Sequence, residues 1–149
     1  MGGRINRGRA TSKSSKINSS HNQDILNAAE PNVSFSFKYF KVDEEFHIDH
    51  EKEYFQKVIY RLRDLCGNTR SQLLSNRSSA LRCHPIDWSD NRVSRVGFDI
   101  PNEEDLCAET YQVSVSGNEY GRLIGFFTES ATFNLVWFDR EHKLYPGDL

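Results

Sequence analysis

The sequence predicts an α+β fold, in which an antiparallel sheet of one N-terminal strand and a C-terminal three-strand meander is packed by one or two helices. Apolar and polar residues alternate over 33–39, and apolar residues recur at helical spacing over 49–66. Three short strand-like runs joined by tight turns then fill 111–138. A strand followed by helices and a meander is typical of helices laid on one face of a sheet.

The first strand is expected near residues 33–39. In "VSFSFKY" every second side chain is apolar or aromatic, and serine or lysine stands between them. This alternation is typical of a strand with one buried face. The buried face would carry Val33, Phe35, Phe37 and Tyr39.

The main helix is expected over Asp49–Cys66. Asp49 fits an N-cap, and two glutamates follow where the helix dipole is positive. Its apolar positions repeat every three or four residues: Tyr54, Val58, Leu62 and Leu65. Gly67 fits the C-terminal stop, and a second, shorter helix is expected around 69–76.

The middle of the chain has no continuous pattern. The apolar residues of 93–98 fit a short strand, and the acidic cluster at 103–105 fits a surface loop. We therefore expect a single domain over 31–149 with a loop-rich insertion at about 85–110. A disordered basic tail would precede it over 1–30, because that segment holds too few apolar residues to fold.

The last forty residues predict the meander. "YQVSVS", "RLIGFF" and "TFNLVWF" are strand-like, and the links "GNEYG" and "TESA" are short. Short links make neighbouring strands antiparallel.

Charge is distributed unevenly along the chain. The whole chain carries −2 and its first 20 residues carry +5, so the remaining 129 residues carry −7. Three interpretations of the basic segment remain open: a solvated tail without a specific role, an arm that contacts phosphates, or an organelle transit peptide. The phosphate-contacting arm would use Arg4, Arg7 and Arg9.

Several function classes lack their usual signatures. No apolar run reaches the roughly 18 residues of a membrane helix, and no P-loop, dinucleotide-binding, zincin or esterase motif occurs. Three cysteines without a CxxC pair indicate free thiols in the reducing cytoplasm. His47 and His50 flank a helix start without completing a metal-ligand set, so we expect no metal and no cofactor.

The segment "YQVSVSGNEYGRLIGFFTESATFNLVWFDREHKLY" resembles the C-terminal meander of the RelE/ParE toxin superfamily, which includes RelE- and YoeB-like ribonucleases. In that family a strand–helix–helix unit precedes the meander, an arginine opens the second meander strand, and a basic tail with histidine or lysine and tyrosine follows the third. Arg122 after "GNEYG" and "DREHKLY" after the last strand match those positions.

The resemblance implies a toxin that cleaves RNA, including ribosome-bound mRNA, by attack of a 2′-OH on the adjacent phosphate. It further implies RNA or the ribosome as a partner, and a cognate antitoxin protein. The implied catalytic residues are His142, Arg122, Tyr145 and Glu141. The implied phosphate-binding residues are Arg140 and Lys143, with the N-terminal arginines in support.

Within those roles, Arg122 would stabilise the phosphate, and His142 would be the acid/base because histidine titrates near neutrality. Tyr145 would stack on a base or donate a proton, and Glu141 is a second candidate base. The alternative is a non-catalytic α+β module that binds a protein partner and contacts nucleic acid through its basic tail. Under that alternative "DREHK" is a solvated strand end, since charged residues commonly follow a buried strand.

Overall fold

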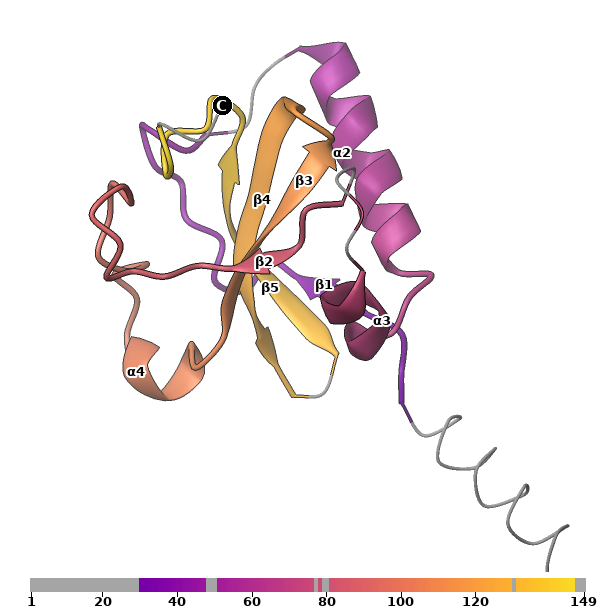
Figure 1. The fold of residues 1–149 in the computed structure, drawn as a ribbon, viewed down its shortest axis with the longest axis horizontal. Coiled ribbons are helices and arrows are strands. Elements are labelled where there is room, and N and C mark those ends of the chain that lie inside the picture. Colours follow the sequence, from indigo (N-terminus) through magenta and orange to yellow (C-terminus); the bar gives the residue numbers. More distant parts are fainter. Residues whose placement is uncertain (1–29, 48–50, 77, 79–80, 130, 147–149) are drawn as a thin grey trace, which may run out of the picture. The chain divides into compact units, whose positions relative to one another are not determined.

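The computed structural model describes residues 30–47, 51–76, 78, 81–129 and 131–146 (Figure 1). The expected disordered tail, with Arg4, Arg7 and Arg9, lies outside these residues apart from Glu30. Across the described residues we find no helix with the length and apolar character needed to cross a bilayer.

The described strands between residues 31 and 146 form one five-stranded sheet. Its strands are β1 (Ser34–Ser36), β2 (His84–Pro85), β3 (Thr110–Ser116), β4 (Glu119–Thr128) and β5 (Thr132–Asp139). They lie in the order β1-β5-β4-β3-β2, and the neighbours β3, β4 and β5 are antiparallel. The predicted meander is confirmed, and the chain is α+β.

The sheet is mixed, so the prediction of a purely antiparallel sheet is wrong. β1 runs parallel to β5, with Ser34 opposite Thr132. Alternating side chains report which face of a strand is buried and carry no information on its direction, which is why the sequence could not distinguish the two arrangements. β1 is also shorter than expected, because a turn closed by the bond from the Phe40 N–H to the Phe37 carbonyl follows it. Phe37, expected inside, is 54% exposed.

Within the described residues, three helices accompany the sheet: α2 (Lys52–Leu65), α3 (Arg70–Ser75) and α4 (Glu103–Leu106). Glu51 is the N-cap of α2, and the expected cap Asp49 lies outside the described residues. Gly67 follows the C-cap of α2 as expected but does not adopt the left-handed conformation. α3 confirms the second helix, and the Thr69 and Gln72 side chains form a capping box at its start.

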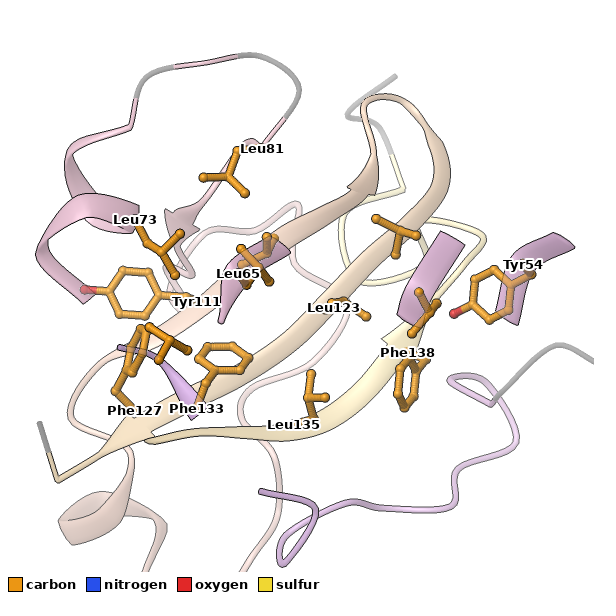
Figure 2. Close-up of a cluster of buried hydrophobic side chains, with 14 residues drawn as sticks. Tyr54, Leu65, Leu73, Leu81, Tyr111, Leu123, Phe127, Phe133, Leu135 and Phe138 are labelled. Carbon is orange, nitrogen blue, oxygen red and sulfur yellow. The ribbon is translucent and has the colours of Figure 1, made fainter. Parts of the chain in front are cut away.

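Side chains from α2 and α3 share one buried cluster with the sheet. Tyr54 and Val58 of α2 and Leu73 of α3 lie in it together with residues of β3, β4 and β5. Figure 2 shows Tyr54 and Phe138 at one end of this cluster and Leu73 at the other. Burial of these aromatic and aliphatic groups is the main term that stabilises the helical face.

The segment between β2 and β3 contributes to a second buried cluster. Ile86 and Phe98 of this segment pack with Trp137 of β5. The expected strand at 93–98 is wrong, because those residues form turns and bends around the buried Phe98. The acidic cluster at 103–105, expected as a loop, begins the short helix α4.

Candidate functional site

The candidate residues gather where β5 ends and β4 begins. Arg122 of β4 lies opposite Asp139 of β5 in the strand register. Two residues further into the sheet, Ile124 and Trp137 pair and belong to the second buried cluster. Because side chains of a strand alternate between faces, Arg122 and Asp139 face the same side as that cluster.

Arg122 is enclosed by protein. The residue is 6% exposed, and its Nη1 donates to the carbonyl oxygens of Gly117 at 3.1 Å and Gly121 at 3.2 Å. These bonds fasten the β3–β4 turn to the start of β4. A phosphate could reach the guanidinium only after the turn moved, so the geometry favours a positioning role for Arg122 over the phosphate-stabilising role expected from sequence.

Asp139 holds the turn that follows β5. Its two carboxylate oxygens accept the backbone N–H groups of Lys143 at 2.8 Å and Leu144 at 2.9 Å. Burial raises the pKa of this carboxyl above 3.8, and the two backbone hydrogen bonds and the nearby His142 partly offset that effect. The turn places His142 at φ 57°, a left-handed conformation that histidine adopts more readily than most residues.

Arg140 lies on the other, helical side of the sheet. Its guanidinium carbon is 5.0 Å from the ring centroid of Tyr54 and 5.1 Å from that of Tyr120. Its Nη2 donates to Glu51 Oε2 at 2.7 Å. Two aromatic faces and a carboxylate therefore fix the guanidinium beside the start of α2.

The remaining predicted residues are also engaged. Lys143 Nζ lies 3.2 Å from Glu141 Oε2, and both side chains are partly exposed. The Tyr145 hydroxyl accepts the backbone N–H of Asp87 at 3.3 Å, and the ring packs against the second buried cluster. Burial raises the pKa of Tyr145 above 10.0. Tyr145 thus ties the chain end to the segment before β3, which fits packing better than base stacking.

A histidine far away in sequence also lies at this site. His47 lines a hollow of about 20 Å³ together with Glu45, Phe138, Arg140 and Glu141. That volume admits about one water molecule, so an RNA base would have to lie over the hollow and not inside it. From the sequence, His47 was noted only as one of two histidines that flank a helix start without completing a metal-ligand set. Nothing in the pattern around it indicates that it lines the same hollow as Arg140.

Comparison with known proteins does not assign the chain to a family. No family model matches the chain, and neither a curated protein nor a solved structure is significantly similar to it. Function must therefore be inferred from the site itself.

The turn after β5 carries an imidazole that two cations flank in sequence, each beside a carboxylate, and the Arg140 guanidinium lies on the helical side of the sheet beside Tyr54. His142 is half-buried and lies between Arg140 and Lys143 in sequence. Arg140 and Lys143 contact Glu51 and Glu141, so their charge is partly compensated. Such an arrangement can move a proton at His142 and bind an anion where phosphate displaces a carboxylate.

Proposed function

We propose that this chain is an endoribonuclease whose active site is the turn after β5. His142 acts as the acid/base, and Arg140 and Lys143 bind the scissile phosphate. The observation that carries the proposal is the turn held by the Asp139 carboxylate, which fixes His142 in a left-handed backbone conformation. Residues outside the common backbone regions concentrate at functional sites, where the surrounding structure must hold them.

The chemistry is a transesterification followed by release of one strand. A base removes the proton from a ribose 2′-OH, and the oxygen attacks the adjacent phosphorus. The bond from phosphorus to the 5′-oxygen then breaks, and an acid protonates that oxygen. The products are a 2′,3′-cyclic phosphate and a 5′-hydroxyl. Cations beside the phosphorane stabilise the charge that develops there.

The carboxylates beside the two cations do not prevent phosphate binding. Both ion pairs are partly exposed. Exposed ion pairs contribute about 0–1 kcal/mol, so a phosphate that meets both cations can displace one or both glutamates. Arg122 acts in this proposal through the β3–β4 turn, and Tyr145 through packing.

Other features fit a toxin of the RelE/ParE type. The order of a strand, two helices and a meander is the order that the resemblance implies. Under this proposal the protein acts in the cytoplasm on RNA, including ribosome-bound mRNA, and an antitoxin restrains it. The N-terminal arginines would add a salt-dependent attraction to RNA that offsets the acidic remainder of the chain.

The chemical groups at the ends of the RNA fragments test the proposal. The purified full chain is incubated with a single-stranded RNA, with and without ribosomes, and the new ends are analysed. We expect 2′,3′-cyclic phosphate and 5′-hydroxyl ends, and a loss of cleavage in the double variant Arg140→Ala/Lys143→Ala. Lys38→Ala removes an exposed lysine near the end of β1 and serves as the control. Intact RNA under both conditions would contradict the proposal.

A second candidate is a non-catalytic α+β module that binds a protein partner. It is favoured by the enclosed Arg122 guanidinium and by the carboxylates that compensate Arg140 and Lys143. The same assay separates the candidates, because the module leaves RNA intact with or without ribosomes.

A further inference from the structure

Ser94, in the segment between β2 and β3, contacts the turn after β5 that carries His142. Its Oγ donates to the Lys143 carbonyl oxygen at 2.8 Å, and its backbone N–H donates to the Leu144 carbonyl oxygen at 2.9 Å. Ser94 stands 49 residues before Lys143 in the chain. A distant part of the chain therefore contributes two hydrogen bonds to the backbone of this turn.

The peptide group between Lys143 and Leu144 is held at both ends. Its carbonyl oxygen accepts from Ser94 Oγ, and its N–H donates to Asp139 Oδ2 at 2.9 Å. Because a peptide group is planar, bonds at both ends fix the direction of the whole group. Asp139 Oδ1 also accepts the N–H of Lys143 at 2.8 Å, which restrains the peptide group directly after His142. The backbone that follows His142 is thus held by Asp139 from the sheet and by Ser94 from the segment between β2 and β3.

The residue after Ser94 anchors it to the rest of the fold. Arg95 Nη2 donates to Asp43 Oδ1 at 3.2 Å and to Glu45 Oε2 at 2.8 Å. Its guanidinium carbon also lies 5.5 Å from the ring centroid of Trp137, two residues before the end of β5. Charge-assisted hydrogen bonds and a cation–π contact together restrain the backbone at this point. The Ser94 hydroxyl therefore approaches the turn after β5 from a defined direction.

We infer that Ser94 is a positioning residue for His142, an inference that rests on the proposed function. The Ser94 hydroxyl sets the direction of the Lys143 carbonyl and thereby the conformation of the turn in which His142 acts. Ser94 is exposed, so a water molecule can replace its hydroxyl as a donor to that carbonyl. The water is not attached to the segment between β2 and β3 and does not fix the carbonyl's direction. Loss of the hydroxyl should therefore loosen the turn without unfolding the protein.

Three variants separate this role from a general effect on stability. Ser94→Ala removes the bond from Oγ and keeps the backbone N–H that bonds the Leu144 carbonyl. Ser94→Thr keeps a hydroxyl, and the exposed position leaves room for the added methyl group. Ser89→Ala is the matched control, because Ser89 is an exposed serine of the same segment whose Oγ donates to Asp87 Oδ1 at 2.6 Å.

Nuclear magnetic resonance signals of the His142 ring report its position in the absence of RNA. They are identified in a proton–carbon correlation spectrum as the ring signals that His142→Asn lacks. We expect one set of narrow signals in the wild type, in Ser94→Thr and in Ser89→Ala. In Ser94→Ala we expect shifted or broadened signals, because the loosened turn exchanges between conformations. The spectra are recorded well below the unfolding temperature, where a merely less stable protein keeps the wild-type signals.

The kinetics of RNA cleavage provide a second readout. Proton transfer requires the acid/base to lie within hydrogen-bond reach of the reacting atoms, whereas the cations that bind RNA remain in Ser94→Ala. We therefore expect Ser94→Ala to lower kcat about tenfold with little change in KM. Ser94→Thr should restore kcat, and Ser89→Ala should cleave RNA like the wild type.

Two kinds of failure are distinguishable. Wild-type His142 signals or a wild-type kcat in Ser94→Ala would overturn the inference. The same signal change in Ser89→Ala, or a Ser94→Thr protein that behaves like Ser94→Ala, would overturn it too. If the wild type leaves RNA intact, the proposed function fails, and the His142 ring signals still decide whether Ser94 positions this side chain.

Discussion

Arg122 and Asp139 lie opposite each other on β4 and β5, and each bonds the backbone of a different turn. Arg122 holds the β3–β4 turn through two carbonyl oxygens, whereas Asp139 holds the turn after β5 through two N–H groups. The two side chains therefore fix both turns at this end of the sheet. Any function of His142 depends on this pair for its geometry.

Arg122→Ala should destabilise the fold before it affects chemistry. Removing the guanidinium leaves two carbonyl oxygens without their charged donor, and hydrogen bonds to charged groups contribute about 1.5–3 kcal/mol. We expect the free energy of unfolding, measured with urea, to fall by about 2 kcal/mol. Arg63→Ala, at an exposed ion pair, should change it by less than about 0.5 kcal/mol. A fully stable Arg122→Ala protein that no longer cleaves RNA would instead assign Arg122 to the phosphate.

Replacing Asp139 by asparagine should change the way in which the free energy of unfolding depends on pH. Burial raises the pKa of Asp139 in the folded state above its usual 3.8. The carboxyl therefore stabilises the fold most when it is protonated, and that contribution is lost as pH rises through the folded pKa. We expect the stability of the wild type relative to Asp139→Asn to decrease as pH rises from about 3 to 7.

Asp43 provides a control, because its effect on stability should depend on pH in the opposite direction. Burial raises its pKa, but hydrogen bonds from the Glu45 N–H and the Arg95 side chain outweigh burial and lower the pKa below 3.8. The Asp43 carboxylate therefore stabilises the fold at pH values above its pKa in the unfolded state. That stabilisation is lost as pH falls through its pKa in the folded state. The stability of the wild type relative to Asp43→Asn should therefore decrease toward acid pH. If the stability of the wild type relative to both variants changed with pH in the same direction, the Asp139 carboxyl would not be buried in the folded state.

Gly121→Ala should disrupt the site, and Gly117→Ala should not. Both glycines have positive φ, at 73° and 55°, so both substitutions carry the backbone cost of about 1–2 kcal/mol. A Cβ on Gly121 would also overlap the Asp139 carbonyl oxygen and the backbone of Arg140, whereas a Cβ on Gly117 meets nothing within 4 Å. We expect thermal unfolding to show a loss of about 3 kcal/mol or more for Gly121→Ala and about 1 kcal/mol for Gly117→Ala. Equal losses would mean that the close approach of β4 to Arg140 is not maintained in solution.

The sequence predicted the elements whose contacts are local. The amphipathic repeat from Tyr54 to Leu65 and the short links of the meander depend on neighbours along the chain, and both were confirmed. The direction of β1 was wrong because alternation is the same in parallel and antiparallel strands. The burial of Phe98 was missed because its partner Trp137 stands 39 residues later and the segment between 86 and 107 has no repeat.

In the candidate site, too, only the features that are local in sequence could be predicted. The segment from Arg140 to Lys143 was identified from its composition, because charged residues directly after a buried strand are visible in sequence. Its partners were not visible. Glu51 lies 89 residues before Arg140, and the enclosure of Arg122 depends on carbonyl oxygens of a turn, which no side-chain pattern records.

The rate of RNA cleavage by His142→Asn tests the central claim most directly. Asparagine tolerates the left-handed backbone at this position, so the variant removes the imidazole and keeps the turn. His84→Asn, on the edge strand β2, is the matched control. We predict that His142→Asn lowers the rate by about a hundredfold or more while His84→Asn cleaves like the wild type. A folded His142→Asn protein that cleaves RNA at the wild-type rate would contradict the assignment of His142 as the acid/base.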